Sequence, residues 1–340
     1  MRIELPISKS IANRLLILQA IHGDELMPVS DSMPDDVQIL HRALCLIALS
    51  PHRLIDVGNC GTAMRFLTAY CTQLEGQTTI LDGVERMRHR PIGQLVDALR
   101  EIGADIEYLG EEGFPPLRIK GCILDKHRIV TINNPLSTQF VSALLLIGAK
   151  VQTDSTSPYI YITQEVIKQY QLSPFSYHLS VEKDWSSAAF WYEYVALYGG
   201  EITLLGLSRD SLQGDKIVAD IFAHLGIHTT YTAEGAVISS SPLHPTPYTL
   251  HHDFVACPDL YPAVALTCER LGIELHATGV ESLPLKESDR LCAVREHRTD
   301  ADHRMAMALL IAGYEVDDTA CISKSYPNFI EHFRHINSLK

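Results

Sequence analysis

The chain has 340 residues, 46% of them hydrophobic, and its formal net charge is −13. Such a length can form two domains with full cores, and the acidic balance argues against nucleic acid or an anionic membrane as a partner. No apolar run approaches the ~20 residues of a membrane helix.

The cysteines and histidines follow no metal-ligand spacing. The eight cysteines are scattered along the chain, and the sixteen histidines form no H-E-x-x-H pattern. The first residues lack the apolar region of a signal peptide. We therefore expect a cytoplasmic protein with free thiols and no metal site.

A helix is predicted after the extended segment that begins at Leu5, and either Ser8 or Ser10 can cap it. Lys9 and Arg14 lie near its start. A lysine at a helix N-terminus opposes the helix dipole, so a bound anion explains it better than helix stability does. The alternative is a solvated first turn with two exposed cations.

The segment 58–67 combines Gly58 and Gly61 with the start of an apolar helix. Glycine has no Cβ, so a ligand can lie directly on this backbone. The first turn of the helix offers N–H groups and a positive dipole end to an anion. Two glycines before a helix are a weak signal alone, and a plain turn is the alternative.

One local pattern recurs in the segments 77–103, 200–226 and 272–290. Each segment has a predicted strand, then a glycine, a charged turn and, as far as it runs, a helix. Repeated βα units of this kind predict an α/β protein built from several similar modules.

Nearly every predicted helix start carries a cation, a hydroxyl group or a carboxylate. The sequence Ser137-Thr138-Gln139 precedes one apolar helix, where capping alone is the alternative to ligand binding. Asp259 and Glu287 are the acid–base candidates. If these starts converge, they form a cationic cleft suited to phosphate and carboxylate groups. A nucleotide is not expected, because the chain has no G-x-x-x-x-G-K-[ST] and no G-x-G-x-x-G after a strand.

Five segments resemble the 5-enolpyruvylshikimate-3-phosphate synthase family. They are PISKSIANR (6–14), GNCGTAMR (58–65), RPIGQLVDALR (90–100), LKESDR (285–290) and DHRMAM (302–307). The resemblance implies an α/β (α+β) fold with two domains, each of three βαβαββ modules with buried helices and outer sheets. It places residues 8–182 in one domain and residues 1–7 plus 183–340 in the other, joined by two crossover segments that form a hinge.

The resemblance also implies the reaction. The enolpyruvyl group of phosphoenolpyruvate would move to the 5-hydroxyl of shikimate 3-phosphate, with release of phosphate. It implies no cofactor, a monomer, and inhibition by glyphosate, a phosphoenolpyruvate mimic for which Gly61 leaves room. The alternatives are UDP-N-acetylglucosamine enolpyruvyl transferase, which shares the fold and chemistry, and a non-catalytic binder of anionic metabolites.

The residue roles follow from the same resemblance. Asp259, Glu287 and Lys324 would be catalytic, and which acid performs which proton transfer stays open. The residues expected to bind shikimate 3-phosphate are Lys9, Ser10, Arg14, Ser137, Thr138, Gln139, Thr156, Asp259, Ser282 and Lys286. The residues expected to bind phosphoenolpyruvate are Lys9, Gly61, Arg90, Gln139, Arg290, Arg304 and Lys324.

The chain departs from the family in four short stretches, namely 41–55, 146–156, 170–177 and 290–302. Losing a strand from a βαβαββ module would leave an open sheet edge. We therefore favour the interpretation that loop residues are missing from the sequence at these points, and a reduced member of the family is the alternative. The first interpretation predicts breaks of many ångströms between consecutive residues, against ~3.8 Å across a peptide bond.

Overall fold

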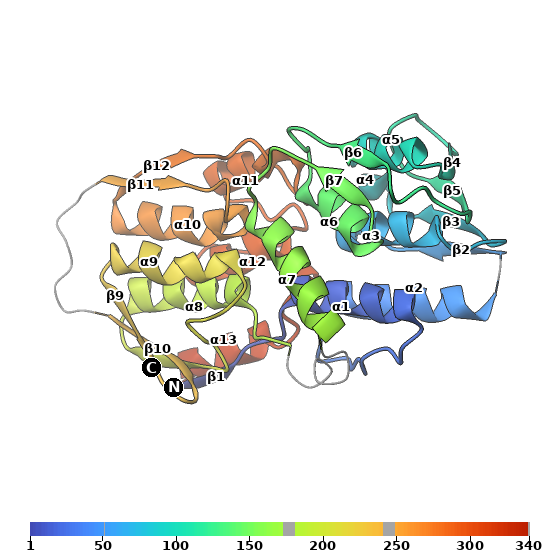
Figure 1. Cartoon of the computed structure of the whole chain (residues 1–340). Helices are drawn as coiled ribbons and strands as arrows, with labels where there is room; N and C mark the ends of the chain where they lie inside the picture. The colour runs from blue at the N-terminus through green and yellow to red at the C-terminus, as the bar shows by residue number, and fades with distance from the viewer. Residues whose placement is uncertain (51, 173–180, 241–248, 339–340) are drawn as a thin grey trace. The chain divides into compact units, whose positions relative to one another are not determined.

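A computed structural model describes residues 1–50, 52–172, 181–240 and 249–338 (Figure 1). The chain forms two compact units. The first unit contains residues 9–30 and 36–180, and the second contains residues 1–8, 31–35 and 181–340.

The first unit contains a complete βαβαββ module with a four-stranded sheet in the order β2-β3-β5-β4. Strands β2 and β3 are parallel, whereas β5 is antiparallel to both β3 and β4. One face of the sheet is buried, because Thr79 and Leu81 of β3 alternate with half-buried residues. The elements are β2 (His52–Asp56), α3 (Gly61–Cys71), β3 (Thr78–Asp82), α4 (Glu85–Arg88), α5 (Gly93–Glu101), β4 (Asp105–Tyr108) and β5 (Leu117–Lys120).

The rest of the first unit is mainly helical. Two short parallel strands, β6 and β7, form a separate sheet. Helices α6 and α7 pack against each other, and α1 packs against α7. The elements are α1 (Lys9–His22), α2 (Asp35–Leu49), β6 (Ile129–Thr131), α6 (Thr138–Leu146), β7 (Lys150–Gln152) and α7 (Pro158–Leu172).

The second unit repeats this arrangement. Its four-stranded sheet has the order β1-β8-β10-β9, and β11 and β12 form a two-stranded parallel sheet. The strands are β1 (Arg2–Glu4), β8 (Glu201–Leu205), β9 (Ile227–Tyr231), β10 (Gly235–Ser240), β11 (Thr249–Asp253) and β12 (Glu274–Thr278). The helices are α8 (Trp185–Tyr198), η2 (Gly214–Ile217), α9 (Val218–Ala223), η3 (Pro258–Leu260), α10 (Tyr261–Leu271), η4 (Leu283–Leu285), α11 (Arg290–Glu296), α12 (His303–Ala312), η5 (Ala320–Lys324) and α13 (Phe329–Ser338).

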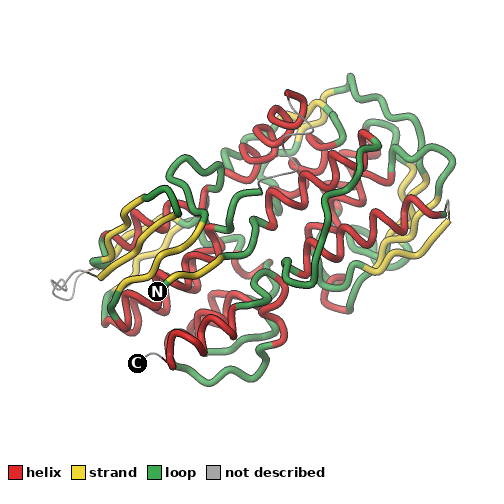
Figure 2. The backbone as a smooth tube through the Cα atoms, turned by 90° about the horizontal axis from the view of Figure 1, so that it is seen from below, coloured by secondary structure: helices red, strands yellow, loops and turns green. Residues whose placement is uncertain are grey.

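Helices fill the core of each unit, with the sheets packed on them (Figure 2). Every residue of α8 from Trp185 to Ala196 is buried, as are nearly all residues of α3. A helix that is apolar all round is expected only where other elements surround it. The predicted mixed fold with buried helices is confirmed.

The strand content differs from the expectation. Among the described residues each unit has six strands, whereas three complete βαβαββ modules would have twelve. The chain is continuous where the structure describes the short stretches, and whether loop residues are missing from the sequence there stays a prediction. Across 290–302 the N–H groups of Arg298 and Asp302 donate to Ala293 and Thr299, and β7 follows α6 directly. The segment 173–180 lies outside the described residues.

Candidate functional site

A buried arginine, Arg290, organises the predicted site residues of the second unit. It begins α11, which Asp289 caps by accepting from the N–H of Cys292. Its side chain is 1% exposed. The Nε donates to Asp302 at 2.7 Å, Nη1 to Asp259 at 2.7 Å and Nη2 to Glu287 at 3.1 Å. Burial alone would lower the pKa of Arg290, but the three carboxylates outweigh it and raise the pKa above its ordinary value.

Asp259 forms ion pairs with two further cations besides Arg290. It lies in η3, directly before α10. Its Oδ2 is 2.9 Å from Nη2 of Arg304, and its Oδ1 is 3.5 Å from Nζ of Lys286. Arg304 is buried in the first turn of α12. One carboxylate therefore contacts three of the predicted ligand-binding cations.

Glu287 links Arg290 to Lys324, because it accepts from Arg290 and its Oε1 also accepts from Nζ of Lys324 at 2.9 Å. Both side chains are mostly buried. The structure thus brings together Asp259, Lys286, Glu287, Arg290, Arg304 and Lys324, which we call the Arg290 network. Ser282 lies directly before η4, where its carbonyl accepts from the N–H of Leu285, and among the described residues no hydrogen bond or ion pair joins it to this network.

Two carboxylates of this region were not among the predicted site residues. Asp302 caps α12 and also accepts from Arg290 and Ser288. Asp215 is buried at the start of η2 and accepts from the hydroxyl of Ser186. Burial, together with the charge of Asp259, raises the pKa of Asp215 to about 7. Asp302 and Asp215 each lie just before or within the first turn of a helix, which is the same position from which the other site residues were predicted.

In the first unit, Gly61 packs directly on two guanidinium groups. A Cβ at Gly61 would lie 2.6 Å from Nη1 of Arg90 and 2.8 Å from Nη1 of Arg65. The expectation that Gly61 leaves open room is therefore wrong at the Cβ position, which the arginines already fill. Arg65 is held by the carbonyl oxygens of Gly61 and Pro91, each at 3.2 Å.

Arg90 differs from Arg65 in what its nitrogens contact. Its Nε and Nη1 are buried, and among the described residues they have no hydrogen-bond partner. A buried donor without a partner costs about 1–3 kcal/mol. The guanidinium lies at the first residue of α3, where the helix dipole also favours an anion. Arg90 and the N-terminus of α3 together offer the donors and the dipole that suit an anion, and binding of an anion here stays a prediction.

Lys9 and Arg14 lie on α1 but have different surroundings. Nζ of Lys9 is 3.1 Å from Oδ2 of the buried Asp36, another residue that sequence reasoning missed. Arg14 is buried and donates to Thr163 and Ser142 and to the backbone carbonyl of Ser10. Burial lowers the pKa of Arg14 to about 10. Its contacts within the protein indicate that it positions the start of α1, and its contact with substrate stays a prediction.

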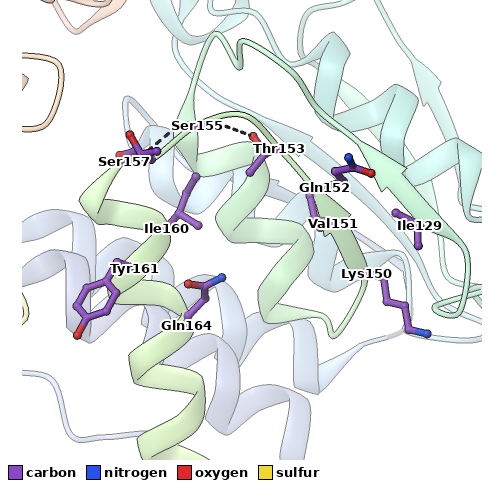
Figure 3. Close-up of a pocket in the computed structure, with 11 residues that line it drawn as sticks. Ile129, Lys150, Val151, Gln152, Thr153, Ser155, Ser157, Ile160, Tyr161 and Gln164 are labelled. Carbon is purple, nitrogen blue, oxygen red and sulfur yellow. Dashed lines mark hydrogen bonds between the residues drawn. The ribbon is translucent and has the colours of Figure 1, made fainter.

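The start of α6 is joined to the start of α3. Ser137 caps α6 by accepting from the N–H of Gln139 at 3.3 Å, and Nε2 of Gln139 donates to Thr62 at 3.0 Å. Thr138 is the first residue of α6. Thr156 lies elsewhere, at a cavity of about 630 Å³. Figure 3 shows other residues that line this cavity, from β7 and α7.

The described residues contain no group of three or more histidine, cysteine, aspartate or glutamate side chains placed to hold a metal ion. Within the same ranges, every helix is too short or too polar to cross a membrane. Two α/β units whose helices begin with arginines, lysines and carboxylates are the arrangement expected of a protein that holds anionic small molecules.

Comparison with known proteins places the chain within this class. The family described as EPSP synthase (3-phosphoshikimate 1-carboxyvinyltransferase) matches residues 35–173, 146–297 and 295–333. A 3-phosphoshikimate 1-carboxyvinyltransferase of Bacteroides fragilis is 37% identical, with 98% of this chain and 94% of the relative covered. One from Cellvibrio japonicus is 30% identical, with 99% and 96% covered. The chain belongs to the EPSP synthase family.

A solved structure shares the fold. The EPSP synthase of Acinetobacter baumannii has a TM-score of 0.70 at 19% identity, with 98% of this chain and 95% of that chain covered. The family and fold predicted from the sequence are confirmed, and the comparisons support this family rather than UDP-N-acetylglucosamine enolpyruvyl transferase.

Proposed function

We propose that the protein transfers the enolpyruvyl group of phosphoenolpyruvate to the 5-hydroxyl of shikimate 3-phosphate, giving 5-enolpyruvylshikimate 3-phosphate and phosphate. This is a step of chorismate and aromatic amino acid biosynthesis. The observation that carries the proposal is the Arg290 network, in which both acid–base candidates contact a single buried guanidinium. The same carboxylates also stabilise the buried arginine, but next to a bound anion they would weaken binding, so a pure binder of anions has less use for them than an enzyme.

The reaction needs proton transfers at two separate atoms. The vinyl carbon C3 takes a proton while the 5-hydroxyl attacks C2 and loses one, and C3 gives up a proton again when phosphate leaves and the double bond re-forms. Asp259 and Glu287 contact different Nη atoms of Arg290, which fixes their spacing across one planar group. We assign the hydroxyl proton to Asp259 and the C3 proton to Glu287.

The cations around these carboxylates can stabilise the negative charge on the departing phosphate. Lys324 contacts Glu287 and can assist phosphate departure next to the acid. Arg304 is held against Asp259, and Arg90 has buried donors to offer to phosphoenolpyruvate. We propose Lys9 and the residues at the start of α6 as contacts of shikimate 3-phosphate.

A phosphate-release assay tests the activity. Release is expected only with both substrates present, and none with UDP-N-acetylglucosamine in place of shikimate 3-phosphate. Phosphate release with UDP-N-acetylglucosamine would support the rival enzyme, and tight binding of both substrates without any release would support the metabolite binder.

Substitution of the two carboxylates tests their roles. Glu287→Gln is expected to abolish deuterium incorporation at C3 of phosphoenolpyruvate in D₂O, and both Glu287→Gln and Asp259→Asn should lower kcat about 10²- to 10⁴-fold. Asp289→Asn, which changes an exposed helix cap, is the matched control. If Glu287→Gln still incorporates deuterium at C3, a group other than Glu287 must supply the C3 proton.

We also propose a cytoplasmic location, because all eight cysteines are free thiols. The substrates are small molecules, as the family implies, and the acidic chain favours no nucleic acid partner.

A further inference from the structure

The segment that joins Lys324 to α13 is fixed by a short chain of hydrogen bonds outside the Arg290 network. Tyr326, which follows Lys324 by two residues, is 1% exposed. Its hydroxyl oxygen accepts from Nε1 of Trp191 on α8 at 3.2 Å and lies 2.9 Å from Nδ1 of His332 on α13. One phenol group therefore joins the end of η5 to two helices of the second unit.

Aromatic rings enclose this phenol. The Tyr326 ring lies edge-on to Trp191 and to Phe329, with ring centroids 6.5 and 5.5 Å apart. Edge-to-face contact is a favoured geometry between aromatic rings. The backbone is fixed as well, because the N–H of Tyr326 donates to the carbonyl of Ile322 in η5 at 3.0 Å. The position of Tyr326 is thus coupled to the last turn of η5, which carries Lys324.

The chemistry of the three polar groups sets the direction of the hydrogen bonds. An indole N–H can only donate, so the oxygen of Tyr326 is the acceptor for Trp191. Among the described residues, Nδ1 of His332 is the one acceptor that the O–H of Tyr326 has. This nitrogen accepts only when it carries no proton. The chain is therefore complete only when His332 is neutral and has its proton on Nε2.

Protonation of His332 breaks this order. Both ring nitrogens then donate, and the buried O–H of Tyr326 is left without an acceptor. The charged and titratable groups that face the imidazole are Glu4 of β1, Glu331 and His335 of α13, and Lys183, which pairs with Glu4. Burial lowers the pKa of His332 more than the two glutamates raise it. The surroundings thus favour the neutral ring that the chain requires.

We propose that Tyr326 and His332, in its neutral form, are positioning residues for Lys324. The inference rests on the proposed function, in which Lys324 assists phosphate departure beside Glu287, whose Oε1 accepts from its Nζ at 2.9 Å. When His332 takes up a proton, the O–H of Tyr326 loses its acceptor and the last turn of η5 is no longer fixed. Turnover is expected to fall below about pH 6.5, the ordinary pKa of histidine, through a group that acts only by way of Tyr326.

The same chain links stability to pH. Because the folded state lowers the pKa of His332, it binds this proton more weakly than the unfolded chain does. The contribution of His332 to stability is therefore complete above about pH 6.5 and is lost as the pH falls through the folded-state value. The melting temperature and the turnover should thus fall together on acidification.

A series from pH 7.5 down to pH 5 tests the proposal by kcat for phosphate release and by Tm. His332→Asn supplies an oxygen close to the place of Nδ1, which accepts without titrating. It should keep the wild-type kcat at pH 7.5 and lose about threefold less than the wild type at pH 5. His332→Leu offers no acceptor and should lower kcat about tenfold at both ends of the series, with an unchanged KM for shikimate 3-phosphate. His335→Asn, at an exposed position of α13, is the matched control and should follow the wild type.

Two further measurements need no activity. Nitrogen NMR of the imidazole should show His332 with its proton on Nε2 at pH 7.5, and Tyr326→Phe should make the ring bind a second proton about tenfold more tightly. Hydrogen–deuterium exchange of residues 322–329 should be faster in His332→Leu and unchanged in His332→Asn. If the wild type releases no phosphate, the proposed function fails, and these two measurements still decide whether the chain holds this segment.

Three results overturn the proposal. The first is an imidazole of His332 that carries its proton on Nδ1. The second is a His332→Asn variant whose kcat and Tm follow the wild type at every pH. The third is unchanged exchange of residues 322–329 in both His332→Leu and Tyr326→Phe, because the segment would then be held without the hydroxyl group.

Discussion

Replacing Gly61 with alanine tests whether the packing of Arg90 on this residue positions phosphoenolpyruvate. The new Cβ would lie 2.6 and 2.9 Å from the two Nη atoms of Arg90 and 2.8 Å from Nη1 of Arg65. Ordinary carbon–nitrogen contact requires about 3.5 Å, so the guanidinium must move by close to 1 Å. Since it ends a flexible side chain, the fold should survive. The loss of one aligned charge-assisted hydrogen bond costs about 1.5–3 kcal/mol.

This cost corresponds to a rise of about 10- to 100-fold in KM for phosphoenolpyruvate. The assay varies phosphoenolpyruvate at saturating shikimate 3-phosphate and records Tm for the same samples. Glyphosate is expected to inhibit the wild type and to inhibit Gly61→Ala less, because it occupies the phosphoenolpyruvate position. Gly93→Ala, whose Cβ meets nothing closer than 3.5 Å, is the matched control. An unchanged KM in Gly61→Ala would refute this account of Arg90.

The remaining predictions concern two buried carboxylates. Asp302→Asn weakens the ion pair that holds Arg290, so it should lower Tm by several degrees and raise KM for phosphoenolpyruvate, whereas Asp289→Asn should do neither. The pKa of Asp215 is raised from 3.8 to about 7, so the folded state binds this proton more tightly than the unfolded state. Asp215 therefore reduces stability progressively from about pH 4 to pH 7 and by a constant amount above that. Asp215→Asn should raise Tm more at pH 8 than at pH 5, a difference that Asp220→Asn, on the exposed side of α9, should not reproduce.

The helix starts that carry the site residues could be predicted, because a helix cap depends only on residues close together in the sequence. Ser137, Asp289 and Asp302 each accept a backbone hydrogen bond within three residues of their own position. A short polar side chain ahead of an apolar run is sufficient to identify such a start. The hinge between the two predicted domains depends on no such local signal, and it stays a prediction.

The electrostatic partners could not be predicted, because they depend on contacts between distant residues. Lys9 pairs with Asp36, and Arg290 pairs with Asp259, which is 31 residues away in the sequence. The motifs predicted that the cations bind ligands, which stays a prediction, and they did not show that carboxylates would pair with them. A buried arginine without these partners would be strongly destabilising, so the pairs maintain the fold as well as the chemistry.

The predicted site residues do not depend on the outer strands of the modules for their placement. Each predicted site residue lies on a helix or in a loop, and none lies on a strand of the described sheets. The helices that carry them, such as α3 and α12, are buried on nearly all sides and pack mainly on other helices. The predicted site residues therefore keep their positions whatever the number of outer strands in a module.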